Sequence, residues 1–136
     1  MADMASLFTK IIKGEIPSTK VYEDADVLGF LDIKPVNPGH TLVIPKKHYV
    51  NVHDMPDELV GKVAIVAKKI ADALLKMGVK GVNIGTNNGE AAGQIVFHAH
   101  THVMPRYGKD KFSIWVGKEY DGNEREAVAE KIRVSL

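Results

Sequence analysis

Three of the chain's six histidines fall at every second position of one short segment, "VFHAHTHVMPR", as His98, His100 and His102. Successive side chains of a β-strand point to opposite faces. If this segment is a strand, the three imidazoles share one face, with neighbouring Cα atoms about 6.6 Å apart at a rise of roughly 3.3 Å per residue. The residues that then face the core are Phe97, Ala99, Thr101 and Val103.

Such a row of imidazoles has three interpretations. The first is a solvated sheet face. The second is a metal site, because two histidines at i and i+2 can both reach one zinc ion, with His40, His48 or Asp32 as further ligands. The third is nucleophilic attack by His100 on phosphorus, which needs one unprotonated ring nitrogen and a fixed acceptor for the proton on the other, commonly a backbone carbonyl. Spacing alone leaves all three open.

The segments before the histidines predict a helix, a hairpin and a buried strand. Apolar residues at helical spacing, Leu7, Phe8, Ile11 and Ile12, are followed by Gly14 and Pro17, which predicts a short helix that ends there. "KVYED" and "VLGFLDI" read as a hairpin, and "KPVNPGH" as an exposed loop that ends at His40. "TLVIP" follows as a buried strand.

The longest predicted element is a helix over residues 55–77, with Asp54 as its N-cap and Gly78 closing it. A strand at 79–85, a polar loop and the histidine strand 95–105, closed by Pro105, come next, and Asn123 can cap a terminal helix. Because strands and helices do not alternate, an antiparallel α+β meander is expected. The apolar stripe of the long helix comprises Leu59, Val63, Val66, Ile70, Leu74 and Met77.

Composition restricts the class of protein. With 136 residues, 45% of them hydrophobic, the chain is expected to form a single soluble domain over residues 1–136. The absence of cysteine excludes disulfides and thiolate zinc sites. A net charge of +1 without a basic block makes a nucleic-acid partner unexpected, and no apolar run is long enough for a membrane span. The segment "MADMASLFTK" does not resemble a secretory signal, so the cytoplasm is the expected location.

The segment "GQIVFHAHTHVMPR" closely resembles the H-φ-H-φ-H-φ-φ signature, with φ apolar, of the histidine triad (HIT) family of nucleotide hydrolases and transferases. "KIIKGEIPS", "FLDIKPVNPGHTLVIPKKH" and "NIGTNNGEAAGQ" resemble family segments in order and spacing, most closely those of small prokaryotic HIT proteins. The resemblance implies the HIT fold, a mostly antiparallel five-stranded sheet with a long helix and short terminal helices.

The resemblance implies roles for individual residues of the motif. His100 is similar to the nucleophile that forms a covalent nucleotidyl-histidine at the α-phosphate, His102 to the residue that helps to hold that phosphate, and His98 to the histidine that supports the row from behind. Gln94 resembles the side chain that contacts the bridging or leaving oxygen. These four residues form the expected catalytic group.

The expected substrate-binding residues lie in the other matching segments. Asn87 resembles a phosphate-side hydrogen bonder, Asp32 the carboxylate that bonds the ribose hydroxyls, and His40 the histidine near the site. A carboxylate suits a ribose diol because its two oxygens can accept both hydroxyl protons. Apolar residues that could line a purine site, or pack in the core, are Phe8, Ile11, Leu31 and Ile33.

The chain departs from the family pattern in two places. Where many prokaryotic members have the Cys-x-x-Cys of a structural zinc site, completed by histidines equivalent to His48 and His98, it has Ser6 and Thr9, so no metal and no other cofactor is expected. Ile95 stands where the family usually has a serine or threonine beside the phosphate. A lost charge-assisted hydrogen bond is worth about 1.5 to 3 kcal/mol, or roughly ten- to a hundredfold in rate.

The resemblance predicts a hydrolase that cleaves purine nucleoside phosphoramidates or dinucleoside polyphosphates through a nucleotidyl-histidine and releases the nucleoside monophosphate. The alternative is a non-catalytic or weakly catalytic nucleotide-binding or scaffolding HIT protein. A homodimer is expected to form through the sheet edge and the helix at 55–77, which gives an exposed edge strand a partner.

Overall fold

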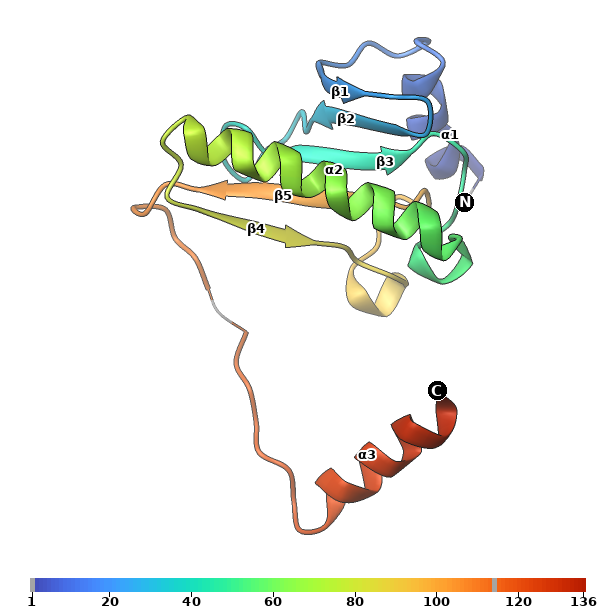
Figure 1. Ribbon diagram of the computed structural model, residues 1–136, viewed down its shortest axis with the longest axis vertical. Coiled ribbons are helices and arrows are strands. Elements are labelled where there is room, and N and C mark those ends of the chain that lie inside the picture. Colours follow the sequence, from blue (N-terminus) through green and yellow to red (C-terminus); the bar gives the residue numbers. More distant parts are fainter. Residues whose placement is uncertain (1, 114) are drawn as a thin grey trace.

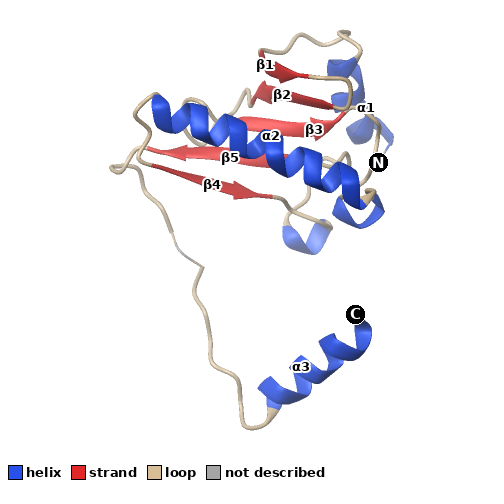
Figure 2. Cartoon of the chain, viewed as in Figure 1, coloured by secondary structure: helices blue, strands red, loops and turns tan. Residues whose placement is uncertain are grey.

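Five strands form one antiparallel sheet in a computed structural model that describes residues 2–113 and 115–136, with side chains from residue 7 onward (Figure 1). The strands are β1 (Lys20–Glu23), β2 (Val27–Leu31), β3 (Thr41–Pro45), β4 (Gly81–Gly85) and β5 (Thr101–Arg106). The helices are α1 (Ala2–Ile12), α2 (Asp57–Lys76) and α3 (Glu124–Ser135), with 3₁₀ turns η1 (Val52–Asp54) and η2 (Glu90–Ala92) (Figure 2). The predicted α+β class is confirmed.

The strand order differs from a simple meander. The sheet runs β1-β2-β3-β5-β4, so β4 rather than β5 lies at the edge. The connection through α2 carries the chain across the sheet to its far side, and β5 then returns between β3 and β4 (Figure 1). This order makes β5, the strand that carries His102, an interior strand between β3 and β4, where both of its neighbours can contribute side chains.

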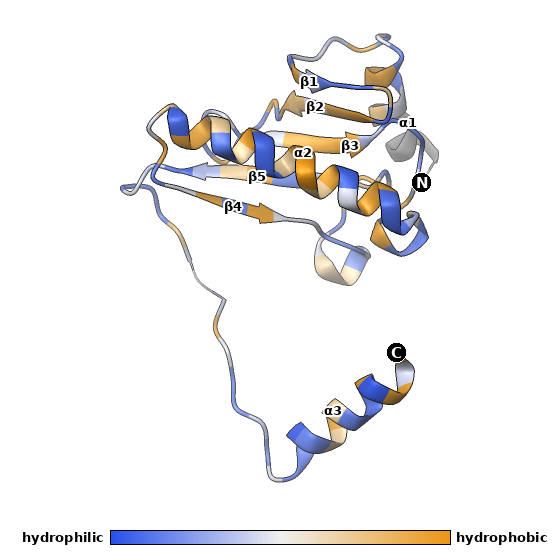
Figure 3. Cartoon of the chain, viewed as in Figure 1, coloured by the Kyte–Doolittle hydropathy of each residue, from blue (hydrophilic) through white to orange (hydrophobic). Residues whose placement is uncertain are grey.

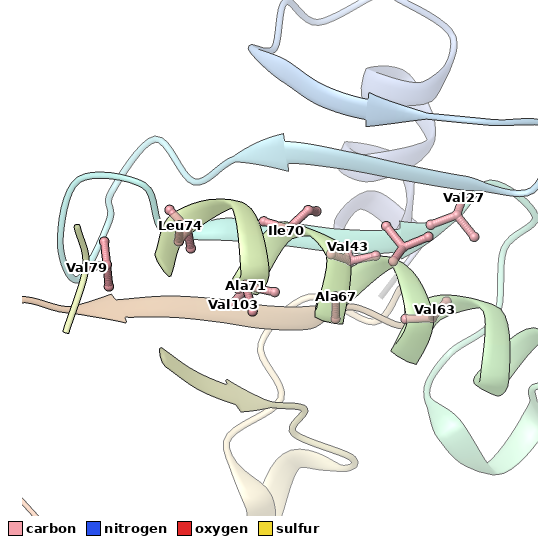
Figure 4. Close-up of a cluster of buried hydrophobic side chains, with 10 residues drawn as sticks. Val27, Val43, Val63, Ala67, Ile70, Ala71, Leu74, Val79 and Val103 are labelled. Carbon is pink, nitrogen blue, oxygen red and sulfur yellow. The ribbon is translucent and has the colours of Figure 1, made fainter. Parts of the chain in front are cut away.

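The long helix covers one face of the sheet. Ile70 and Leu74 of α2 pack on Val27, Val43 and Val103, one residue from each of the three middle strands (Figure 4). Figure 3 shows the mixture of apolar and polar residues along α2 that this one-sided packing requires. The expected stripe holds as far as Leu74 but is wrong for Met77, because the helix has ended there and Met77 is 74% exposed.

The start of α2 also differs from the prediction. The helix begins at Asp57 with Pro56 in the N-cap position, so Asp54 is not its cap. The Asp54 carboxylate instead accepts hydrogen bonds from the main-chain N–H groups of Val50 and Asn51, both at 3.0 Å. The Asp54 side chain therefore stabilises the preceding 3₁₀ turn η1 and does not cap α2.

The first helix covers only half of the opposite face. Phe8 and Ile11 of α1 pack on Leu28, Leu42 and Ile44 of β2 and β3. Side chains on the same face of β5 lie beyond this cluster, at the boundary between a covered and an open half of the sheet. His100 and His102 lie at the edge of the part of the sheet that α1 covers, and a cavity opens there beside the packed cluster.

The histidine strand is shorter than predicted. β5 begins at Thr101, and residues 95–100 are irregular, while Pro105 lies within the strand and Arg106 ends it. The ladder to β3 stops at the pair Val43↔Thr101 because β3 ends at Pro45, which has no N–H to donate. The Pro45 carbonyl accepts from the His98 imidazole instead, at 2.9 Å.

The residues after β5 leave the sheet. The segment 107–123, hereafter the arm, leads to α3, which lies apart from the sheet in Figure 1. Asn123 precedes α3 as predicted, but its side chain makes no capping hydrogen bond. No helix among the described residues is long and apolar enough to cross a membrane.

Candidate active site

His100 is held in one tautomer by the main chain. Its Nδ1 lies 2.8 Å from the carbonyl oxygen of His98, which can only accept, so Nδ1 carries the proton and Nε2 has a free lone pair. The Phe8 ring packs edge-on against the imidazole, with ring centroids 5.2 Å apart. A backbone carbonyl therefore supplies the fixed proton acceptor that a nucleophilic imidazole requires.

His102 is held by a second chain of hydrogen bonds. The N–H of Val36 donates to Nδ1 of His40 at 3.0 Å, so the proton of the neutral His40 ring is on Nε2. That Nε2 lies 2.9 Å from Nδ1 of His102 and donates to it. The proton of His102 is thereby directed to its Nε2, which makes that nitrogen a hydrogen-bond donor.

Burial keeps these histidines neutral. Desolvation is the main cause that lowers the pKa of His40, His98 and His100, and it lowers the pKa of His102 to about 4, helped by the adjacent rings of His100 and His40. The centroids of His100 and His102 are only 5.0 Å apart, so two positive charges would repel each other. At neutral pH the site therefore presents the Nε2 lone pair of His100 beside the Nε2–H group of His102.

A cavity of about 660 Å³, here called the Asp32 cavity, opens beside these two rings. It lies between α1 and the segment after β2, and both His100 and His102 line it. Its walls include Phe8 and Ile11, while Ile33 and Ile95 stand on its rim with 90% and 71% of their surfaces exposed. Its size falls in the range of about 300 to 1,000 Å³ that is typical of small-molecule sites.

One oxygen of the Asp32 carboxylate accepts a main-chain hydrogen bond, and the other lies near His40. Oδ1 accepts from the N–H of Lys34 at 2.9 Å, which forms the turn before Pro35. Oδ2 lies 3.7 Å from Nε2 of His40. The Asp32 side chain, 21% exposed, therefore both caps the turn and lines the cavity, and its carboxylate retains lone pairs for a hydroxyl pair there.

Asn87 and Gln94 have different surroundings, although both were expected to contact substrate. Asn87 is exposed and lines the Asp32 cavity, with a weak contact of 3.5 Å from Nδ2 to the Gly93 carbonyl. Gln94 is only 4% exposed and lines no described cavity.

The amide of Gln94 is fully used within the protein. Its Oε1 accepts from Gly89 N–H at 2.9 Å and from Asn51 Nδ2 at 3.2 Å, and its Nε2 donates to the carbonyls of Val50 and Val96 at 2.6 and 3.1 Å. The contact of Gln94 with a bridging or leaving oxygen stays a prediction, and it would require Gln94 to exchange one of these hydrogen bonds. The side chain anchors the loop that precedes the triad.

The residues at the family's structural zinc position do not suit that metal. His98 is fully buried and, within the described residues, its Nδ1 has no hydrogen-bond partner. The His48 ring lies beside it, 5.0 Å between centroids. The remaining positions hold Thr9 and Ser6, whose side chain lies outside the described residues. Structural zinc needs four thiolate, imidazole or carboxylate ligands, and these positions offer two. The expected lack of zinc stays a prediction.

A second group with potential metal ligands lies within the site. Asp32, His40 and His102 bring one ligand atom each to within 4.8 Å of one another. The His40 and His102 nitrogens that face each other are 2.9 Å apart, a hydrogen-bond distance, whereas two nitrogens on one tetrahedral zinc are separated by about 3.3 Å. The geometry thus favours a shared proton at this position over a bridging ion.

A second cavity, about 540 Å³ and here called the Lys111 cavity, adjoins the first. His102 and Asn87 line both of them. Lys111 and Phe112 of the arm line it on one side. These two residues were not predicted to line a site, because the arm resembles no family segment. The alternation of His102 and Met104 on the predicted strand 95–105 indicated only which strand residues share this face.

Comparison with known proteins identifies the family. The HIT domain model matches residues 13–109. The chain belongs to the HIT domain family. Among curated relatives, it is 54% identical over 112 residues to "Protein hit" of Bacillus subtilis, covering 80% of this chain and 77% of that protein. It is 40% identical over 114 residues to the adenosine 5'-monophosphoramidase hnt1 of Schizosaccharomyces pombe, covering 84% and 83%.

A solved structure also supports this membership and fold. The crystal structure of a HIT family protein from Bacillus anthracis superposes with a TM-score of 0.87 at 42% identity, covering 96% of each chain. The predicted HIT fold is confirmed. The matched family range ends at residue 109, so the inclusion of the arm and α3 in a single domain over 1–136 stays a prediction.

Proposed function

We propose that this HIT protein hydrolyses purine nucleotides at the α-phosphate through a covalent nucleotidyl-histidine on His100. The observation that carries this proposal is the hydrogen bond from His100 Nδ1 to the His98 carbonyl, which leaves Nε2 unprotonated beside the Asp32 cavity. The relative named as an adenosine 5'-monophosphoramidase supports nucleotide hydrolysis at the level of the family.

The reaction has two balanced steps. The Nε2 lone pair of His100 attacks the α-phosphorus, a P–N bond forms, and the bond to the leaving group breaks with its electron pair on the departing atom, which takes a proton from solvent. Water then attacks the same phosphorus and loses a proton to solvent, which replaces the proton taken by the leaving group, while the P–N bond to His100 breaks and its electron pair returns to Nε2 as the nucleoside monophosphate departs. Net consumption is one water molecule, and the second step regenerates the neutral imidazole.

The neighbouring residues position the nucleotide. His102 Nε2–H donates to a non-bridging oxygen, and Asn87 can donate a second hydrogen bond across the cavity mouth. Asp32 binds the ribose hydroxyls, while Phe8 and Ile11 offer an apolar surface to the base. Enzymes accelerate nucleotidyl transfer mainly by positioning the reactants and by stabilising the charge that develops on the phosphate oxygens.

The assignment is tested by assaying the purified protein with adenosine 5'-phosphoramidate and with a diadenosine polyphosphate. Release of AMP from either, unaffected by a strong chelator, is expected. Binding of nucleotide without turnover would favour the scaffolding alternative instead, and loss of turnover on chelation would favour the zinc enzyme.

The expected cytoplasmic location of the protein stays a prediction.

Ile95 is expected to limit the rate, because it stands at the cavity rim with no hydroxyl to offer the phosphate. Ile95→Thr and Ile95→Val are a matched pair that differ only by a hydroxyl replacing a methyl group. We expect kcat/KM of the threonine variant to exceed that of the valine variant by about tenfold, the effect of one hydrogen bond that strengthens in the transition state. Equal rates of the two variants would show that the hydroxyl contributes nothing here.

The same proposal includes a homodimer formed through the edge strand β4 and α2. Ile84 on β4 and Ile65 and Leu75 on α2 are about half exposed, at 51%, 57% and 50%, and β4 has a free edge. Sedimentation velocity at micromolar concentration is expected to give twice the monomer mass. A monomer at these concentrations would contradict the dimer.

A further inference from the structure

The side chain of Asn37 joins the loop between β2 and β3, residues 32–40, to the far end of β5. Its amide Nδ2 donates two hydrogen bonds of 2.9 Å, one to the Pro105 carbonyl of β5 and one to Oδ2 of Asp110 in the arm. Asn37 is half-buried and lines no described cavity. The side chain is therefore placed to hold the loop and not to bind a ligand.

Asp110 is a well-fixed acceptor for this amide. Its Oδ1 accepts from the main-chain N–H groups of Tyr107 at 2.8 Å and Gly108 at 3.1 Å, and Oδ2 also accepts from Arg106 at 3.4 Å. The hydrogen bond from Tyr107, followed by that from Asn37, lowers the pKa of Asp110 to about 2, so the carboxylate is ionised at neutral pH. Hydrogen bonds to an ionised acceptor are stronger than those between neutral groups. The arm thus anchors the loop through Asn37.

The anchored loop determines where the protons of the site lie. The His40 N–H donates to the Asn37 carbonyl at 3.0 Å, and within the turn so formed the Val36 N–H donates to Nδ1 of His40, also at 3.0 Å. If the turn opened, Nδ1 of His40 could carry the proton, and Nε2 would then accept from Nδ1–H of His102. His102 would present a lone pair to the phosphate in place of an N–H donor.

We propose that Asn37 and Asp110 are positioning residues of the reaction, which hold the loop so that His40 keeps its proton on Nε2 and His102 offers Nε2–H to the phosphate. This proposal rests on the function proposed above. Neither residue is assigned a contact with substrate. Both act through Val36, whose N–H can reach the His40 ring only while the loop keeps its turn.

The protonation of each ring nitrogen tests the proposal without turnover. ¹⁵N NMR at about pH 8, well above the ordinary histidine pKa of about 6.5, distinguishes the two neutral tautomers. In the wild type we expect Nε2–H for His40 and His102 and Nδ1–H for His100. In Asn37→Ala, about a tenth or more of the His40 and His102 rings should change to Nδ1–H, because the hydrogen bonds that select the tautomer are weakened. His100 should be unaffected, since its acceptor, the His98 carbonyl, lies outside the loop.

Turnover provides a second measure. In Asn37→Ala, kcat/KM for adenosine 5'-phosphoramidate should fall about two- to fivefold, because the His102 donor is less well placed. The loss is smaller than the roughly tenfold cost of removing a hydrogen bond outright, since the Tyr107 hydroxyl still donates to the Pro38 carbonyl and keeps the loop attached.

Asp110→Asn removes the ionised acceptor with little change of shape and should give the same tautomer change. Because both substitutions break one contact, their effects on kcat/KM should not multiply, and the double variant should lie within about twofold of the lower single variant. Asn123→Ala is the matched control: Asn123 is exposed, and its side chain makes no capping hydrogen bond to α3. It should change neither the tautomers nor the rate.

Three results would overturn the proposal. These are wild-type tautomers of His40 and His102 in both single variants, effects on kcat/KM that multiply in the double variant, and a tautomer change that extends to His100. Absence of turnover in the wild type would reject the proposed hydrolase, while the NMR spectra would still decide whether Asn37 and Asp110 set the tautomers.

Discussion

Replacing His100 with alanine is expected to lower kcat/KM for adenosine 5'-phosphoramidate by at least about 10⁴-fold, because it removes the only nitrogen assigned to attack phosphorus. The fold should survive, since His100 is half-buried beside a cavity and its imidazole donates a single hydrogen bond, to the His98 carbonyl, while the bond from Thr86 to the His100 carbonyl involves the main chain and is kept. Initial rates of AMP release, together with circular dichroism of both proteins, provide the measurement.

His53→Ala is the control for this substitution. His53 is exposed, lies on the η1 turn and lines no described cavity, so its loss should leave the rate unchanged. In the wild type, kcat/KM should decline with acid only below the ordinary histidine pKa of about 6.5, because burial lowers the pKa of His100 and the neutral form is the reactive one. A His100→Ala protein that keeps a tenth of the wild-type rate would exclude His100 as nucleophile.

The largest effect on stability is expected from His98→Ala. His98 is fully buried, its Nε2 donates to the Pro45 carbonyl at 2.9 Å, and its ring packs against Phe8 and His48. The substitution creates a cavity and leaves a buried carbonyl without a donor, which together should lower the free energy of unfolding by about 3 to 4 kcal/mol. Urea denaturation followed by fluorescence measures this difference.

Two further variants separate the causes. His98→Phe fills most of the volume but leaves the Pro45 carbonyl unpaired, so it should cost about 1 to 3 kcal/mol, less than alanine. The exposed His53→Ala should change the free energy by less than about 0.5 kcal/mol. If His98→Ala were as stable as the wild type, the support that His98 gives to the triad would be ruled out.

The elements that hold the site could be predicted because each has a local signal. Helical spacing in Phe8 and Ile11, turn residues around the hairpin and Gly78 after the long helix all predicted the elements that form. Alternation predicted that His100 and His102 lie side by side, and their ring centroids are 5.0 Å apart. These signals depend on neighbours in the sequence.

The errors concern residues whose environment is set by distant parts of the chain. Segment 95–100 was predicted as strand, but its ladder ends because β3 stops at Pro45, some 50 residues earlier in the chain. The hydrogen bonds of the Gln94 amide to Val50 and Asn51 could not be predicted either, because only the fold brings these residues near. The place of Lys111 beside His102 and Met104 in one cavity likewise depends on the path of the arm, which no local signal predicts.

The most direct measurement is capture of the intermediate. Wild-type protein is mixed with a diadenosine polyphosphate, quenched in alkali within milliseconds to seconds, and examined by intact mass and peptide mapping. We expect a fraction of the chains to carry one adenylyl group on the imidazole of His100, and none in the His100→Ala protein. Accumulation of AMP with no adduct at His100 at any quench time would contradict covalent catalysis by this residue.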